Sequence, residues 1–308
     1  MKQVWFKNRT IRIAGNLHLP PDFDETKCYA ALVLATPGSS VKEQIGYIYA
    51  SRMAEHGFVA LTFDPSYQGE SGGLPRDLED PATRAEDIRC GVDFLMTQPF
   101  VDENRIGLLG ICAGGGYGIH AALTEHRFKA IGTVVANDIG TAFRAFQPTR
   151  EDLLNTVAEI GRARTAEARG GRPRRDPWIP DSLHQAKEQG ITEPDLLEAV
   201  TFYRETEYKH PRSTNRLLFT SYGSMLAFDA YHLVPELLTQ PLQVIVGSKR
   251  GPSKQYEGGQ RLFNLSPSPD KDFFVIDGAA HYDLYYKPEY VSQAVERLVA
   301  FYKRQLPG

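Results

Sequence analysis

The chain contains 308 residues, of which 42% are hydrophobic, 24% charged and 11% aromatic. This composition is typical of soluble globular proteins, and it excludes a disordered, collagen-like or low-complexity chain. The 35 Lys and Arg residues nearly balance the 38 Asp and Glu residues, for a formal net charge of −3. A charge so close to neutral excludes nucleic-acid or membrane binding driven by bulk electrostatics.

The N-terminal residues carry no apolar run long enough for a signal peptide, and no stretch reaches the roughly 18 apolar residues of a membrane helix. The three cysteines, Cys28, Cys90 and Cys112, are few and odd in number. This count argues against a disulfide framework and fits a reducing compartment. We therefore expect a soluble, cytoplasmic protein.

Hydrophobic periodicity predicts two strands over residues 4–19, joined by a turn near Lys7 to Arg9. Further along, short apolar runs typical of strands buried on both faces alternate with segments of helical spacing. The predicted strands are 30–35, 58–63, 105–110, 130–135, 242–247 and 272–276, and the predicted helices are 41–56, 82–97, 117–124, 256–263 and 288–302. This alternation predicts an α/β fold with a mostly parallel central sheet and helices on both faces.

The alternation stops between about Asp138 and Glu236. This stretch has helical patterns over 153–160, 194–207 and 228–238 and an Arg-, Gly- and Pro-rich connection over 162–180, but no convincing buried strand. We interpret it as an inserted helical cap. The expected organisation is a first core part over 1–137, a cap over 138–236 and a second core part over 237–308.

The segment Gly110 to Gly114 (GICAG) places a cysteine between a predicted buried strand and a helix. A strand that turns sharply into a helix strains the backbone at the central residue, so the residues two before and two after it must be small. At a helix N-terminus, we expect the pKa of the Cys112 thiol to be lowered, which would favour a nucleophilic thiolate. The alternative is an inert buried thiol. Cys28 and Cys90 are better explained as a pre-strand residue and a helix-face residue.

When Cys112 attacks a carbonyl group, the carbonyl oxygen becomes negatively charged, and backbone N–H groups are needed to bind this oxyanion. The N–H of Ala113 is the first candidate, and a second donor would come from the loop after strand 30–35, with Pro37, Gly38 and Ser39 as the candidate residues.

A reactive thiol also needs a base, and His281 lies in the small-residue loop that follows the last predicted strand. From there an imidazole can reach back over the edge of the sheet. The alternative is an ordinary surface-loop histidine. The other seven histidines lie on helices, on the N-terminal strand or in the cap.

Three segments together resemble an α/β-hydrolase: Gly110 to Tyr117 (GICAGGGY), Asp64 to Gly73 (DPSYQGESGG) and Gly278 to Tyr285 (GAAHYDLY). The nearest resemblance is to the dienelactone-hydrolase-like group, and within it to bacterial and fungal hydrolases related to polyketide transferases. It covers nearly the whole chain. It implies the α/β-hydrolase fold, Cys112 as nucleophile and His281 as base, and it says much less about the substrate.

The resemblance also implies an acidic residue shortly after the strand that ends at Gly247, yet residues 248–256 contain none. Three alternatives are open: Glu257 takes the place of the acid, Asp138 after the preceding strand reaches the histidine, or the site works as a Cys-His dyad. The loop after the first core strand departs as well, because Thr36-Pro37-Gly38 stands where related enzymes often have His-Pro-Gly.

The cap carries a basic run and several aromatic residues. The arginines are Arg162, Arg164, Arg169, Arg172, Arg174 and Arg175, and they form either a solvated segment or a contact for the phosphates of an anionic carrier. The aromatic residues Trp178, Phe202, Tyr203 and Tyr208 suit an apolar acyl pocket, or they pack the cap onto the core.

We expect a small-molecule acyl substrate, free or carried by coenzyme A or an acyl carrier protein, and no nucleic-acid or membrane partner. The oligomeric state is open, with a homodimer as one alternative. No cofactor or metal is expected, because the histidines are scattered and the cysteines lack C-x-x-C spacing.

Three hypotheses for the function follow. The first is a Cys-dependent hydrolase, thioesterase-like, that cleaves an activated ester, lactone or thioester through a covalent acyl-enzyme. The second is a biosynthetic acyltransferase or cyclase acting on a polyketide-type acyl chain. The third, prompted by the missing acid, is a non-enzymatic binding protein on a hydrolase scaffold.

Overall fold

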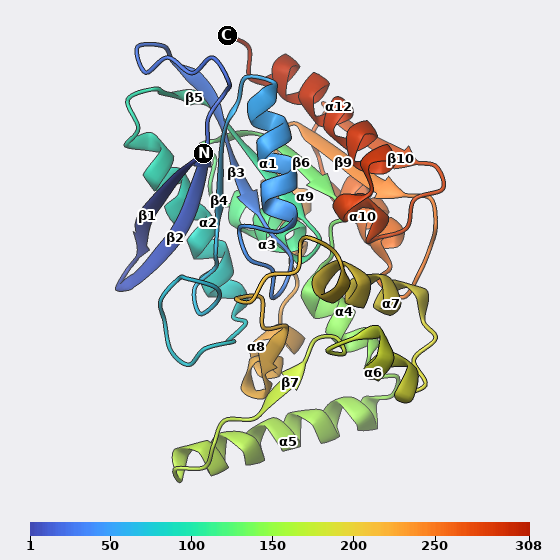
Figure 1. The fold of residues 1–308 in the computed structure, drawn as a ribbon. Coiled ribbons are helices and arrows are strands. Elements are labelled where there is room, and N and C mark those ends of the chain that lie inside the picture. Colours follow the sequence, from blue (N-terminus) through green and yellow to red (C-terminus); the bar gives the residue numbers. More distant parts are fainter.

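The apolar runs of the sequence form the strands of one eight-stranded sheet in the computed structural model, which describes residues 1–308 (Figure 1). The strand order is β1-β2-β4-β3-β5-β6-β9-β10. The strands span Lys2–Asn8 (β1), Ile11–His18 (β2), Tyr29–Ala35 (β3), Val59–Phe63 (β4), Val101–Ile111 (β5), Phe128–Val134 (β6), Leu242–Gly247 (β9) and Lys271–Ile276 (β10). β1 and β2 are antiparallel to their neighbours and the other strands are parallel, which confirms the predicted mostly parallel sheet.

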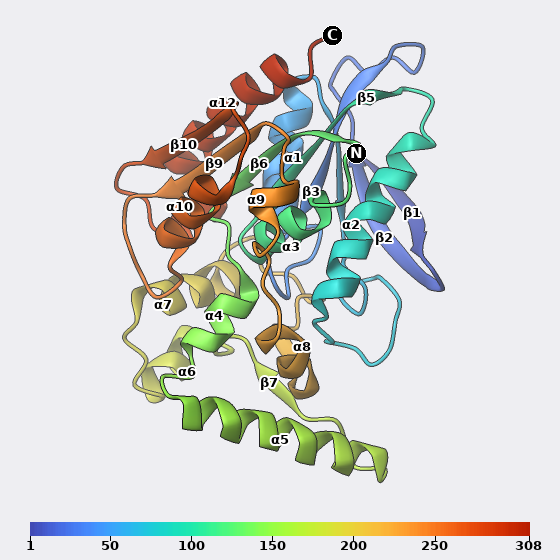
Figure 2. The same ribbon diagram turned by 180° about the vertical axis from the view of Figure 1, so that it is seen from behind.

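Helices cover both faces of the sheet because its central strands are apolar on both sides. On one face lie α1 (Ile45–Glu55) and α12 (Pro288–Gln305), in front of the sheet in Figure 1. On the other face lie α2 (Pro81–Met96), α3 (Ala113–Ala122) and α10 (Gln255–Leu265), which Figure 2 brings to the front. The buried apolar residues form two clusters, one between each helical layer and the sheet. This is the α/β-hydrolase architecture that the sequence predicts.

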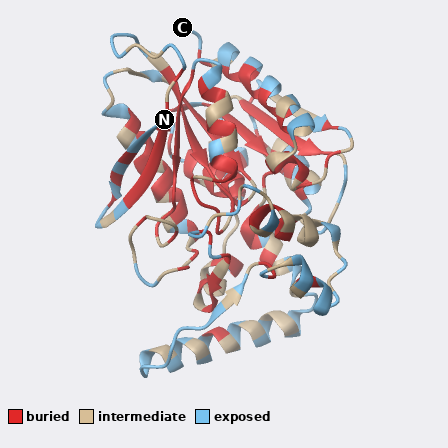
Figure 3. Ribbon diagram, viewed as in Figure 1, coloured by how far each residue is buried: buried red, intermediate tan, exposed pale blue.

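The segment between β6 and β9, called the cap below, lies mostly at one end of the core, although its last helix, at Val234–Leu237, lies beside α3 and α10 (Figures 1 and 2). Its helices are α4 (Ile139–Ala145), α5 (Arg150–Ala168), α6 (Leu183–Glu188), α7 (Pro194–Val200), α8 (Tyr222–Leu226) and α9 (Val234–Leu237), with a π-helical turn at Thr201–Glu205 and a 3₁₀ turn at Phe219–Ser221. α5 is the outermost helix, and most of its length is exposed or half-buried (Figure 3).

Two short strands in the cap, β7 (Arg175–Pro177) and β8 (Arg216–Leu218), pair antiparallel, although the sequence predicts no strand there. Each has three residues, and β7 has no buried residue, so neither leaves a readable apolar run. The helix expected over 228–238 is reduced to the four residues of α9.

Two core helices begin at other residues than the periodicity predicts. α1 begins at Ile45 and not at Val41, because residues 41–44 form a turn in which the Gln44 side chain accepts the Val41 N–H at 3.1 Å. α3 begins at Ala113 and not at Tyr117, so the three glycines at 114–116 are helical and not part of a turn. The turn after β5 is therefore confined to Cys112.

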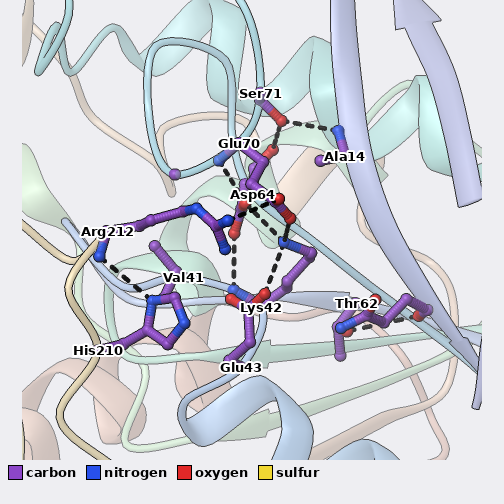
Figure 4. A network of polar contacts seen from close by, with 12 residues as sticks. Ala14, Val41, Lys42, Glu43, Thr62, Asp64, Glu70, Ser71, His210 and Arg212 are labelled. Atoms are coloured by element: carbon purple, nitrogen blue, oxygen red, sulfur yellow. Dashed lines mark hydrogen bonds and ion pairs between the residues drawn. The ribbon is translucent and has the colours of Figure 1, made fainter. Parts of the chain in front are cut away.

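The loop after β3 is anchored by a buried lysine (Figure 4). The Lys42 ammonium lies 3.0 Å from Asp64, 2.7 Å from Glu43 and 2.6 Å from Glu70. Asp64 also accepts the backbone N–H groups of Lys42 and Glu70, both at 2.8 Å. Glu70 in turn pairs with Arg212 of the cap at 3.0 Å, so the network joins two core loops to the cap.

A short helix, α11 (Asp283–Tyr286), lies between the loop after β10 and the last helix, α12. None of the helices is both long and apolar enough to span a bilayer.

Candidate active site

Cys112 lies alone at the sharp turn between β5 and α3, with φ 53° and ψ −127°. This positive φ is a strained conformation for a residue with a side chain, and such strain is concentrated at functional sites. A Cβ on Gly110 would lie 2.6 Å from Gly115 Cα, and a Cβ on Gly114 would lie 2.2 Å from the Ala35 carbonyl oxygen. The sterically required glycines are thus where the sequence pattern places them.

The pKa of the Cys112 thiol is raised, which is opposite to the expectation from its helix N-terminus. Burial has the largest effect, because a thiolate at this position loses part of its hydration. A hydrogen bond from the Tyr285 hydroxyl, the backbone N–H of Ala113 and the charge of Arg84 lower the pKa, but together they do not offset burial. The resting thiol is therefore protonated at neutral pH.

His281 is buried in the loop between β10 and α11, and its Nε2 lies 3.3 Å from the Tyr285 hydroxyl. Burial lowers its pKa to about 4, and the charge of Asp195 opposes this shift. Its other ring nitrogen, Nδ1, is buried without a hydrogen-bond partner. The imidazole is therefore neutral at pH 7 and can accept a proton. Through Tyr285 it is linked to Cys112.

The loop after β3 borders the cavity that Cys112 lines. Its residues Pro37 and Gly38 line this cavity, as does Ala113 at the start of α3. Pro37 has no N–H to donate. The N–H of Gly38 makes no hydrogen bond within the protein, so it is free to bind an oxyanion together with that of Ala113. Ser39 is buried and does not line the cavity, and its carbonyl accepts the Ser213 hydroxyl at 2.8 Å.

Arg84 holds this loop in place. Its buried guanidinium donates to the Thr36 carbonyl at 2.5 Å and to the Pro37 carbonyl at 3.4 Å. It also pairs with buried Glu79 at 3.6 Å. Thr36, which stands where related enzymes often have histidine, thus contributes its backbone carbonyl to the loop's anchorage.

The cavity has a volume of about 460 Å³ and is lined by residues of both the core and the cap. Of its 25 lining residues, 14 are hydrophobic, so the space suits an apolar group. The predicted pocket residues Trp178 and Tyr203 line it. Phe202 and Tyr208 do not, because their rings stack on each other and pack against Tyr286 of α11.

The two carboxylates proposed from the sequence to orient His281 make no contact with it. Glu257 is a partly exposed residue of α10 that pairs with Arg250 at 3.2 Å. Asp138 is the N-cap of α4, where it accepts from Gly140 and Ala230 N–H groups, both at 3.2 Å. Each carboxylate therefore has local partners of its own.

Two residues of the site were not anticipated. Tyr285 lies four residues after His281, in a segment that the resemblance includes, and its hydroxyl lies beside both Cys112 and His281. Asp195 lines the cavity from α7 of the cap. No sequence signal marks Asp195, because it lies 83 residues from Cys112 and 86 from His281 and is surrounded by other acidic residues.

Two arginines of the basic run in the cap form ion pairs, and the other four do not. Arg174 pairs with Glu159 at 2.5 Å and with Asp176 at 2.7 Å. Arg175 pairs with Asp77 of the core at 2.9 Å. The remaining arginines of the run are exposed and have no ion-pair partner: Arg162, Arg164, Arg169 and Arg172.

Known proteins are similar to this chain over most of its length, although no protein-family model matches it. It is 39% identical over 302 residues to the uncharacterized protein YcjY of Escherichia coli K12, covering 97% of this chain and 96% of that protein. It is 30% identical over 227 residues to thiohydrolase aneE of Aspergillus aculeatus, covering 71% of this chain and 69% of that protein. A polyketide transferase of Aspergillus fumigatus is 24% identical over 252 residues, covering 82% of each chain.

Among solved structures, a hypothetical protein of Pseudomonas aeruginosa superimposes with a TM-score of 0.90 at 30% sequence identity, covering 99% of this chain and 93% of that one. The chain belongs to the family that contains YcjY and the thiohydrolase aneE. Its fold is the α/β-hydrolase fold, which it shares with an α/β-hydrolase of a Penicillium species (TM-score 0.80, 21% identity) and a dienelactone hydrolase of Anabaena variabilis (TM-score 0.56, 12% identity). The resemblance noted from the sequence is thereby confirmed. The family supports hydrolase or acyl-transfer activity for this protein.

Proposed function

We propose that the protein is a thiol-dependent acyl hydrolase that acts on thioesters and similarly activated esters or lactones. The observation that carries the proposal is that Cys112 occupies the strained turn after β5 and shares one cavity with His281, Gly38 and Ala113. The thiohydrolase relative supports the same class of reaction.

The reaction begins with a neutral pair, because burial raises the pKa of the Cys112 thiol and lowers that of His281 to about 4. As the sulfur attacks the acyl carbonyl carbon, the thiol proton moves to His281, and the carbonyl oxygen becomes an oxyanion bound by the Ala113 and Gly38 N–H groups. The imidazolium then protonates the leaving thiol or alcohol as its bond to the acyl carbon breaks. The product of this half-reaction is an S-acyl Cys112.

In deacylation water takes the part of the nucleophile, and the Cys112 sulfur becomes the leaving group. His281 takes a proton from water, the resulting hydroxide attacks the S-acyl carbon, and the Cys112 sulfur leaves with the proton from His281. The acid product and the free thiol are regenerated, so no further reactant is needed. Because acyl-Cys112 is itself a thioester, its formation from a thioester or activated ester is nearly balanced in energy, whereas an alkyl ester is a poorer donor.

The aromatic rings that line the cavity favour a substrate with an apolar or aromatic acyl group. It is lined by rings from both parts of the molecule, among them Phe143 and Trp178 of the cap and Tyr282 of the core. Phe143 and Trp178 meet edge to face with ring centroids 5.6 Å apart. A flat, partly unsaturated acyl chain would pack between such rings.

The proposal is tested by intact-protein mass spectrometry after brief exposure to acyl thioesters, activated esters and lactones. We expect an acyl adduct on the wild type that is absent from Cys112→Ala, and turnover that is lost in His281→Ala. Turnover that survives in Cys112→Ala would overturn the proposal. Cys90→Ala is the matched control, because Cys90 is a buried thiol of α2 that does not line the cavity.

A second candidate function is acyl transfer to an organic acceptor, which the polyketide-transferase relative favours together with the cap residues that line the cavity. Product analysis separates the two functions. An amide or ester formed in the presence of amines or alcohols would establish transfer, whereas free acid as the sole product would establish hydrolysis.

A carrier-bound substrate would meet the exposed arginines of the cap. We propose Arg169 and Arg172 as contacts for carrier phosphates, because both are exposed and neither has an ion-pair partner. Replacing both by Glu is expected to raise KM for an acyl-coenzyme A at low salt and to leave KM for a short uncharged thioester unchanged. Equal effects on the two substrates would contradict this.

A further inference from the structure

The loop that follows β9 contains no acidic residue, but a carboxylate from the cap lies against it. Asp195 of α7 accepts the backbone N–H of Ser253 with its Oδ2 at 3.2 Å. Figures 1 and 2 both show α7 close to α10, which this loop precedes. The contact joins residues 58 positions apart in the sequence.

Gly251 makes room for this carboxylate. A Cβ at residue 251 would lie 2.5 Å from Oδ2 and 2.9 Å from Cγ of Asp195, too close for any larger residue without a shift. The loop after β9 is thus shaped around a side chain that comes from the cap. This is the part of the fold from which an α/β-hydrolase of ordinary design would supply its own acid.

Asp195 and His281 line the same cavity, and each has an unused hydrogen-bonding atom. Nδ1 of His281 is buried and has no partner. Oδ1 of Asp195 makes no hydrogen bond, since the contact to Ser253 uses Oδ2. The carboxylate also acts on the imidazole electrostatically, because it is the one charge that opposes the lowering of the pKa of His281 by burial.

The other carboxylates near His281 are already engaged. Asp283 accepts the Ala280 N–H at 2.8 Å with one oxygen and pairs with Lys287 at 2.6 Å with the other. Glu193, which also lines the cavity, accepts the first two free N–H groups of α7 at 3.0 and 2.7 Å. Asp195 is therefore the carboxylate of the cavity with an oxygen to spare.

We propose that Asp195 is the positioning residue of the active site: the cap supplies, through Asp195, the carboxylate that engages Nδ1 of His281 in place of an acid from the loop after β9. The proposal rests on the proposed function. It makes the cap part of the catalytic machinery as well as a wall of the pocket.

The physical reason for such a carboxylate lies in the acylation step. His281 must take up a proton inside an apolar cavity, where the imidazolium loses its hydration. A nearby negative charge stabilises that imidazolium, and an Nδ1–H···O contact leaves Nε2, the nitrogen 3.3 Å from the Tyr285 hydroxyl, unprotonated. Without it, the neutral imidazole would be free to adopt the wrong tautomer.

Asp195→Asn removes the charge and keeps an oxygen that can accept the Ser253 N–H. We expect the acylation rate to fall by roughly 10²-fold, with little change in KM, as for the loss of the acid from other nucleophile-histidine sites. Asp195→Glu should recover part of the rate. The matched control is Glu198→Gln on the same helix, which removes an ion pair with Lys287 and should leave the rate unchanged.

Gly251→Ala is a second and independent perturbation, because it leaves Asp195 in the chain but places a methyl group against its carboxylate. We expect it to lower the acylation rate as Asp195→Asn does. In the double variant the two losses should not add, because both act through one carboxylate. Fully additive losses would overturn the proposal.

A spectroscopic readout does not depend on turnover. Nitrogen NMR of His281 at pH 7 should show the proton on Nδ1 in the wild type and a shift toward the Nε2–H tautomer in Asp195→Asn. An unchanged tautomer in Asp195→Asn together with an unchanged acylation rate would overturn the role of Asp195. If the wild type forms no acyl-enzyme with any substrate, the proposed function fails, and the tautomer still decides the role of Asp195.

Discussion

The hydroxyl of Tyr285 lies 3.3 Å from Nε2 of His281, and the same hydroxyl lowers the pKa of the Cys112 thiol, so one phenol acts on both reactive groups. The phenol is buried, and burial together with the negative charge of a Cys112 thiolate raises its own pKa well above the ordinary value. Tyr285 therefore stays protonated, and its hydroxyl lowers the pKa of the Cys112 thiol.

The first prediction follows from this contact. Tyr285→Phe keeps the ring but removes the donor, so the pKa of Cys112 should rise further. At pH 8 the rate of Cys112 alkylation by iodoacetamide should fall about fivefold, since a hydrogen bond is worth about 1 kcal/mol. Mass spectrometry of the alkylated protein over pH 7 to 10 measures the profile. Tyr286→Phe, a half-buried neighbour, serves as control, and an identical profile for Tyr285→Phe and wild type would refute the contact's role.

The second prediction concerns the buried network around Lys42. Lys42→Met removes the cation that neutralises Asp64, Glu43 and Glu70, and Asp64 is fully buried. Breaking a buried ion pair from one side costs about 3–5 kcal/mol, so urea unfolding should show a loss of this size. The double variant Lys42→Met with Asp64→Asn should recover part of it. A loss below about 1 kcal/mol in the single variant would not fit a buried network.

The third prediction is a dependence of stability on pH at His18. Burial, followed by the charge of the N-terminus, lowers the pKa of His18 from 6.5 to about 4. Between these two values the unfolded chain binds the proton more readily, so stability falls as the pH drops from 6.5 toward 4. From pH 7 to pH 5, the stability of the wild type relative to His18→Asn should decline by about 2 kcal/mol. Urea unfolding of both proteins at the two pH values measures the difference, and a constant difference would contradict it.

The fourth prediction contrasts two glycines. In Gly114→Ala, the added carbon would lie 2.2 Å from the Ala35 carbonyl oxygen, so about 3 kcal/mol or more of stability should be lost together with Cys112 reactivity. In Gly161→Ala, on the exposed helix α5, the added carbon meets nothing within 4 Å. That variant should gain up to about 1 kcal/mol from helix propensity. Thermal unfolding of the two variants beside the wild type tests both signs.

The sequence by itself determined the fold and the position of the nucleophile, because both depend on local patterns. Short apolar runs such as 30–35 and 242–247, alternating with helical segments, are typical of a covered parallel sheet, and the glycines at 110 and 114 reflect a steric demand of the turn at Cys112. His281 could likewise be singled out from its place after the last strand.

Only the tertiary structure decided the charge state of the thiol and which carboxylate stands near His281. The helix N-terminus is visible in the sequence, but the burial that raises the pKa of Cys112 depends on how the cap and Tyr285 close the cavity. Asp195 reaches the loop after β9 across 58 residues of chain. Desolvation and long-range contact are properties of the packed molecule, and no local pattern of residues encodes them.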